Sequence, residues 1–148
     1  MLGSDDLSKA VGLYWESLPP TWHRTRAVIR GLAAEKLHLT VEQFQVLRRI
    51  RHGIASVSSI ALDSRTSRSA VSKAVDALVN RALVSRQQDP RDRRNIPLAL
   101  TAEGERALST IFTEAENWLS ARFSQLSSDE LNLAIRGMEI LQKAFLSQ

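Results

Sequence analysis

Apolar residues recur at the 3.6-residue spacing of a helix over most of the chain, which predicts a mainly helical fold. A first helix is expected from Leu7 to Leu18. We expect Pro19 and Pro20 to interrupt it, because proline lacks a backbone N–H and restricts the residue before it. Helical spacing then resumes and continues to about Lys36.

Three further helix starts are marked by hydroxyl side chains that can cap a helix. Thr40 and Gln43 form a capping box, Ser56 caps a short helix, and Thr66 or Ser67 caps the next. That last helix has one apolar face and one face of small and polar side chains. The apolar face comprises Val71, Val75, Leu78, Val79 and Ala82, and the polar face comprises Ser69, Ser72, Lys73, Asp76 and Asn80.

Two short apolar runs then predict a β-hairpin, so that the fold class is mainly α with a small β-hairpin wing. The run Leu83 to Arg86 pairs with the run Asn95 to Leu100, and Pro97 confines the second strand to a sheet edge. The loop between the strands is rich in charge, where acidic side chains can orient guanidinium groups. Its tip is Arg91, Asp92, Arg93 and Arg94.

Two more helices are predicted after Thr101. The first carries an apolar stripe from Leu108 to Phe123, and a capping box of Ser127 and Glu130 opens the second. The apolar stripes of the first and last helices exceed what the short helices and the hairpin can cover. They pack most simply on each other and on a second copy of the chain, the alternative being a self-contained monomeric core.

Composition and charge narrow the range of functions that the chain can have. The chain has 148 residues, 43% hydrophobic, enough for one compact unit, and it has no cysteine for disulfides or thiolate sites. No apolar run approaches the roughly 20 residues that span a bilayer, so we expect a cytoplasmic protein. Residues 65–94 carry eight basic and three acidic side chains, whereas the rest of the chain has a net charge of −1.

This concentration of positive charge coincides with the helix that has a small polar face and with the hairpin beside it. Phosphates attract such a patch, and small outer side chains let a helix backbone approach the base edges of DNA. The pattern therefore predicts a winged helix-turn-helix that binds double-stranded DNA. The candidate contacts are Ser67, Arg68, Ser69, Ser72 and Lys73 on the helix, and Arg86, Arg91, Asp92, Arg93 and Arg94 on the wing.

The order of these motifs resembles the MarR (multiple antibiotic resistance regulator) family of bacterial transcription factors. The resemblance extends without gaps from about Leu39 to Gly104 and is most specific from Asp89 to Arg94. It implies a dimer built from the terminal helices, and small ligands that bind where these helices meet the DNA-binding lobes. The implied regions are 1–38 for dimerisation, 39–101 for the winged helix-turn-helix, and 102–148 for dimerisation.

The chain departs from the family pattern directly before the predicted recognition helix. Ser64, Arg65 and Thr66 stand where members usually have a leucine, a glycine and another apolar residue. We expect a tighter or more polar turn there. The branch of the family that senses peroxides uses a cysteine, which this chain lacks, so that branch is excluded.

These observations together predict a dimeric repressor that a small ligand releases from a pseudo-palindromic operator. The alternative is a winged helix used for protein contact without sequence-specific DNA binding. No glycine-rich loop or paired histidines are present, so no enzyme, metal site or cofactor is expected. A candidate pocket for an anionic aromatic effector comprises Trp22, His23, Arg26, Phe44 and Arg48, although core packing and solvated charge explain the same residues.

Overall fold

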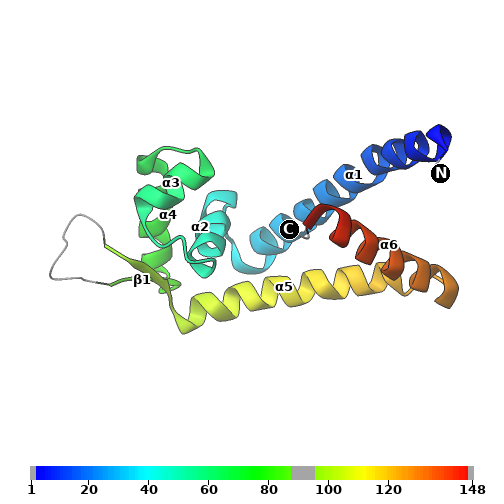
Figure 1. The fold of residues 1–148 in the computed structure, drawn as a ribbon. Coiled ribbons are helices and arrows are strands. Elements are labelled where there is room, and N and C mark those ends of the chain that lie inside the picture. The colour runs from blue at the N-terminus through cyan, green and yellow to red at the C-terminus, as the bar shows by residue number, and fades with distance from the viewer. Residues whose placement is uncertain (1–2, 88–95, 147–148) are drawn as a thin grey trace. The chain divides into compact units, whose positions relative to one another are not determined.

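The computed structural model describes residues 3–87 and 96–146, and it confirms a mainly helical fold with a small antiparallel hairpin (Figure 1). By contacts the chain forms two compact units, Met1–Thr113 and Glu114–Gln148. The elements in chain order are α1 (Ser4–Leu37), α2 (Val41–Arg51), α3 (Val57–Ser64), α4 (Arg68–Asn80), β1 (Val84–Arg86), β2 (Leu98–Leu100), α5 (Ala102–Phe123) and α6 (Ser128–Leu146).

The predicted interruption of the first helix is wrong, because α1 continues through Pro19 and Pro20. The fixed φ of proline is compatible with a helix, and its costs are the lost hydrogen bond to the carbonyl four residues earlier and the crowding of the ring against that carbonyl. These carbonyls belong to Trp15 and Glu16, which are both exposed. Water can therefore hydrogen-bond to the two carbonyls, and the helix is not broken.

Side-chain caps fix the starts of the three short helices, as the sequence predicts. Thr40 opens α2 and Ser56 opens α3, each within a complete capping box. Of the two candidate caps for α4, the structure selects Ser67, whose hydroxyl accepts a hydrogen bond from the N–H of Ala70 at 3.1 Å. Each such cap typically contributes about 1 kcal/mol, so the helix boundaries here are set locally.

The core of the first unit is formed by apolar side chains from α1 to the start of α5. Helix α4 packs against α2, α3 and β1 through its apolar face. Ala82 does not belong to that face as predicted, because it lies beyond the helix end at a positive φ of 55° and is exposed. The most deeply buried side chains are Phe44, Leu47, Ile60, Val75, Leu78, Val84, Leu108 and Ile111.

The hairpin is joined to the helices by backbone hydrogen bonds. In the antiparallel register Val84 lies opposite Leu100 and Arg86 opposite Leu98. The N–H of Leu98 also donates to the carbonyl of Ala55, at 2.8 Å. Residues 88–95 lie outside the described residues, so the predicted wing residues Arg91, Asp92, Arg93 and Arg94 stay predictions from the sequence.

In the second unit, the predicted capping box at the start of α6 is present. The N–H of Ser127 donates to the Glu130 carboxylate at 2.8 Å, and the Ser127 hydroxyl accepts from the N–H of Glu130 at 3.3 Å. The hydrogen bond from the backbone N–H of Ser127 is the main cause that lowers the pKa of the Glu130 carboxyl, and hydrogen bonding by the Ser127 side chain lowers it further. No residue of α6 is buried. Within the described residues, no helix combines the length and apolar character needed to cross a membrane.

Gly104 marks a close approach between the first turn of α5 and the start of the hairpin. A methyl group at this position would overlap the carbonyl oxygen of Leu83. That carbonyl also accepts a hydrogen bond from the N–H of Thr101, at 3.1 Å, so it has little freedom to move. Only glycine therefore allows α5 to begin at this place.

We expect Gly104→Ala to destabilise the protein by about 1–3 kcal/mol, because the backbone at Leu83 must shift. Thermal unfolding measures the loss. Gly31→Ala in α1 is the control, since nothing lies within 4 Å of its added methyl group. That variant should be stabilised by roughly 0.5–1 kcal/mol through lower backbone entropy. Equal unfolding temperatures for the two variants would contradict the close approach.

Candidate nucleic-acid interface

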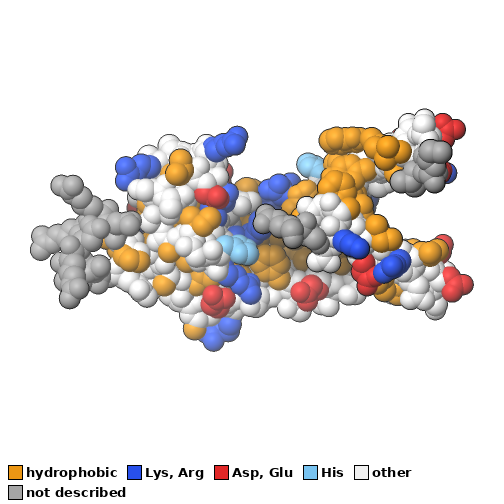
Figure 2. Space-filling model, in the orientation of Figure 1, with side chains coloured by type: hydrophobic (Ala, Val, Ile, Leu, Met, Phe, Trp, Pro, Cys, Tyr) orange, Lys and Arg blue, Asp and Glu red, His pale blue; other side chains and the backbone are white. Residues whose placement is uncertain are grey.

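The outer face of α4 is the centre of the candidate interface. Burial of Val71, Val75 and Leu78 turns the opposite face of the helix outward. Ser69 and Lys73 on that face are exposed and Ser72 is half-buried. Figure 2 shows Lys and Arg side chains at the surface over α3 and α4. The short side chains leave room for another surface to approach the helix backbone closely.

Two of the predicted contact residues are held by the protein itself. The hydroxyl of Ser67 caps α4, and Nη2 of Arg68 donates to Oγ of Ser58 in α3, at 2.6 Å. Both interactions fix the start of α4 against α3. The guanidinium of Arg68 remains exposed and keeps further donors for an external acceptor.

Arg86 of the hairpin is paired with the recognition helix. Its Nη2 lies 2.5 Å from Oδ1 of Asp76, on the outer face of α4. The side chains are 37% and 57% exposed, so solvent screens the pair. The pair couples the direction of β1 to that of α4. Arg86 was predicted as a wing residue, but this partner was not predicted.

Arg81 links the end of α4 to the end of α1, a role that was not predicted from the sequence. Its Nη2 donates to the carbonyl of Leu37 at 2.6 Å and its Nη1 to the carbonyl of His38 at 3.3 Å. These carbonyls lack partners within α1 because they lie at its C-terminus, where a cation is also favoured by the helix dipole. The contact spans 44 positions, and no local pattern predicts it.

The turn between α3 and α4 is polar, as expected from Ser64, Arg65 and Thr66. Oγ of Ser64 donates to the carbonyl of Ile60 at 2.6 Å and lies 2.8 Å from Oγ1 of Thr66. Arg65 is the C-cap residue of α3, with φ 53° and ψ 41° in the left-handed region. The turn keeps the geometry of a glycine C-cap although its residue is an arginine.

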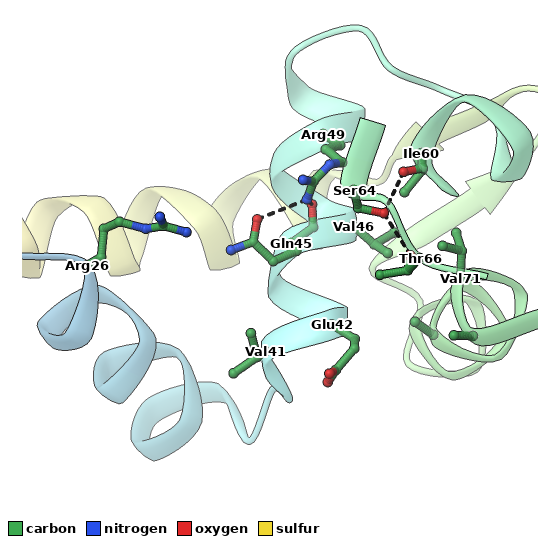
Figure 3. Close-up of a pocket in the computed structure, with 12 residues that line it drawn as sticks. Arg26, Val41, Glu42, Gln45, Val46, Arg49, Ile60, Ser64, Thr66 and Val71 are labelled. Carbon is green, nitrogen blue, oxygen red and sulfur yellow. Dashed lines mark hydrogen bonds between the residues drawn. The ribbon is translucent and has the colours of Figure 1, made fainter. Parts of the chain in front are cut away.

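A cavity of about 250 Å³ lies beside this turn, between α2, α3 and α4, with Arg26 of α1 at its edge (Figure 3). Arg49 spans its wall, donating to Asp63 at 2.7 Å and to the Gln45 side chain at 2.9 Å. The figure shows Arg26 extending from α1 toward Gln45. The lining residues are Arg26, Val41, Glu42, Gln45, Val46, Arg49, Ile60, Ser64, Thr66, Ala70, Val71 and Ala74.

Four of the five predicted effector residues form two ring-cation pairs, and His23 belongs to neither. Arg26 lies 5.9 Å from the ring centre of Trp22, and Arg48 lies 5.9 Å from that of Phe44. Phe44 is buried, whereas Trp22 and His23 are exposed. Of the five predicted residues, only Arg26 lines the cavity just described.

Arg48 has an unusual environment for a cation. Its Nε is buried without a hydrogen-bond partner among the described residues. Burial lowers the pKa of its guanidinium, and the charges of Arg26 and Arg49 lower it further. The positive charges of Arg26 on α1 and of Arg48 and Arg49 on α2 therefore repel one another. Among residues 3–87 and 96–146 no cluster of His, Asp or Glu could hold a metal ion.

Comparisons with known proteins agree with this geometry. The model of the MarR family matches residues 39–96. The chain is 30% identical over 118 residues to the transcriptional regulator HosA of Escherichia coli O111:H-, an alignment that covers 76% of this chain and 87% of HosA. The chain belongs to the MarR family. It is therefore a winged helix-turn-helix transcriptional regulator, of a family that is not enzymatic, as the sequence analysis predicted.

Two further comparisons show how far the similarity extends. The HTH-type transcriptional repressor MdtR of Bacillus subtilis is 32% identical over 98 residues, which are 66% of this chain and 63% of MdtR. The crystal structure of YusO from Bacillus subtilis is 26% identical with a TM-score of 0.69, covering 97% of this chain and 99% of YusO. The fold similarity thus includes the terminal helices that the family model does not match.

The Asp76–Arg86 pair allows a direct test of how the hairpin is attached to α4. We expect Asp76→Asn and Arg86→Met to show a coupling free energy of about 0.2–1 kcal/mol in a double-mutant cycle, because the pair is partly exposed. Urea unfolding at low salt measures the coupling, and screening should reduce it at 1 M salt. Additive effects of the two substitutions at low salt would show that the pair does not hold the hairpin.

Proposed function

We propose that this MarR-family protein is a dimeric repressor that reads a pseudo-palindromic operator with α4 and is released by a small ligand. The observation that supports it most is the outer face of α4, whose small side chains project from a helix anchored by a fully apolar face. Such a helix can enter a major groove, where base edges carry a distinct pattern of donors and acceptors. Repression is proposed by analogy with MdtR, which is named a repressor.

DNA as the partner has support from a structure of the same fold. A mutant of Staphylococcus aureus MepR, 18% identical with a TM-score of 0.68, was solved bound to an oligodeoxyribonucleotide. We assign base reading to Ser69, Ser72 and Lys73, and backbone contacts to Arg68 and the wing. A regulator with this role acts where the bacterial chromosome lies, in the cytoplasm.

Dimerisation is proposed from the apolar surface that each unit leaves exposed. Trp15 and Trp22 on α1 are 67% and 60% exposed, and Leu133 on α6 is 73% exposed. Figure 2 shows hydrophobic side chains spread over α1. Exposed apolar area of this extent is typical of an interaction surface. We therefore assign 1–38 and 102–148 to the dimer and 39–101 to DNA binding.

For the effector, we propose a small anionic aromatic compound near Arg26. Arg26 belongs both to the Trp22 pair and to the cavity beside α4, so a ligand that reaches it also touches the wall of the recognition helix. Staphylococcus aureus MarR, 17% identical with a TM-score of 0.65, was solved in complex with salicylate and kanamycin. A ligand in this place can bias the position of α4 relative to α2.

Base reading by Lys73 is tested by selecting bound duplexes from a random pool with the parent and with Lys73→Ala. We expect the variant to prefer a changed motif, with each lost base contact costing about 1–3 kcal/mol on the parent operator. Lys143→Ala in α6 removes the same charge elsewhere and should leave the motif unchanged. If Lys73→Ala weakened every duplex equally, Lys73 would be a phosphate contact. If the parent protein showed no salt-sensitive binding to any duplex, the result would favour the alternative of a winged helix that contacts another protein.

Dimerisation is tested by sedimentation at micromolar concentration, where we expect twice the 16.5 kDa mass of one chain. Leu133 and Ile140 lie seven residues apart on one face of α6 and are 73% and 55% exposed. Replacing both with glutamate should produce monomers, because two charges cannot be buried in an apolar interface without a large penalty. Asn132→Glu adds a charge at an exposed polar position and should stay dimeric. A parent protein that sediments at 16.5 kDa would refute the dimer.

A further inference from the structure

The turn between α3 and α4 holds an arginine in a conformation that suits glycine. Arg65 has φ 53°, and only His38 and Ala82 share a positive φ among the other non-glycine residues of the described chain. In this region the Cβ of an L-residue approaches the backbone closely, which glycine avoids. Arg65 therefore carries a conformational cost that glycine at this position would avoid.

Contacts within the protein do not offset this cost. In the part of the chain that the structure describes, the guanidinium of Arg65 makes no hydrogen bond or ion pair, and its side chain is exposed. The neighbouring arginines differ, since each is engaged by the protein. Arg49 pairs with Asp63, Arg51 with Glu105, Arg68 with Ser58, Arg81 with the carbonyls of Leu37 and His38, and Arg86 with Asp76.

The position of Arg65 points to an external acceptor. In a helix-turn-helix the N-terminal residues of the recognition helix approach the base edges, and the helix before it crosses the DNA backbone. Arg65 ends that preceding helix, and Ser67, two residues later, caps the recognition helix. The turn therefore lies where phosphates of the bound duplex would pass.

We propose that Arg65 binds a phosphate of the DNA backbone at the edge of the major groove. The proposal rests on the DNA-binding function proposed above. A guanidinium can donate two parallel hydrogen bonds to one phosphate. Such a contact positions α4 in the groove but carries no sequence information, so it supplements the base reading assigned to Lys73.

The strained backbone gives the proposal a test in which stability and DNA affinity change in opposite directions. Arg65→Gly relieves the positive φ and removes the cation together. We expect its unfolding temperature to rise by about 2–4 °C, while its affinity for DNA falls. The fall should be equal on a selected operator duplex and on an unrelated duplex of the same length, because the contact is not to bases.

Salt titration identifies the lost contact as a phosphate. The slope of log affinity against log salt should become less steep by about 0.9 per lost contact, or about 1.8 for a dimer. The advantage of the parent over Arg65→Gly should then shrink by about 12-fold between 50 and 200 mM salt. Arg65→Lys keeps the charge and should keep most of the slope.

Two control variants distinguish the effect of relieving the positive φ from the effect of removing the positive charge. His38→Gly relieves a similar positive φ, 51°, at the end of α1, and should raise the unfolding temperature without changing the slope. Arg106→Gln removes an exposed cation that is paired with Glu103 in α5, and should also leave the slope unchanged.

An Arg65→Gly protein that binds both duplexes with the slope of the parent would overturn the phosphate contact and leave the DNA-binding function intact. A loss confined to the operator would overturn it too, because it would make Arg65 a base contact. Failure of the parent to bind any duplex would instead overturn the proposed function itself.

Discussion

The burial of the apolar face of α4 fixes which side chains this helix presents to the outside. Val71, Val75 and Leu78 are almost fully buried against α2, α3 and the hairpin. With 3.6 residues per turn, this burial leaves a single direction for Ser69 and Lys73, outward. Large-to-small substitutions at such core positions typically cost about 2–5 kcal/mol, so the orientation of the outer face is strongly held.

The basic residues around α4 divide into two groups with different tasks. Arg81 and Arg86 are used inside the protein, where they attach the end of α4 to α1 and its outer face to the hairpin. Arg65 and Lys73 have no such partner among the described residues. The net charge of this region therefore overstates the number of cations that are free to meet DNA, because some of them are paired within the protein.

Local signals in the sequence predict much of this fold. The caps at Thr40, Ser56 and Ser67 and the apolar stripe of α4 depend on neighbouring residues, and the structure confirms them. The predicted interruption of α1 at Pro19 was wrong. The rule that proline breaks a helix does not consider that water can hydrogen-bond to the exposed carbonyls.

Contacts between distant parts of the chain could not be predicted in this way. The bonds from Arg81 to α1, the approach of Gly104 to Leu83 and the cavity beside α4 each join residues that are far apart in sequence. The departure at Ser64, Arg65 and Thr66 was visible as a sequence anomaly. The structural consequence of this departure became clear only from the backbone angle φ of Arg65.

The most direct test of the central claim, that the outer face of α4 lies in the DNA, uses the absence of cysteine in the chain. A single cysteine at Ser69 can carry an iron chelate that cleaves nearby DNA. We expect the Ser69→Cys conjugate to cut a selected operator in two clusters about 10 bp apart, one for each protomer. The same chelate on Ser109→Cys, an exposed position of α5, should cut weakly or not at all. Stronger cleavage from position 109 than from position 69 would show that the outer face of α4 does not lie in the DNA.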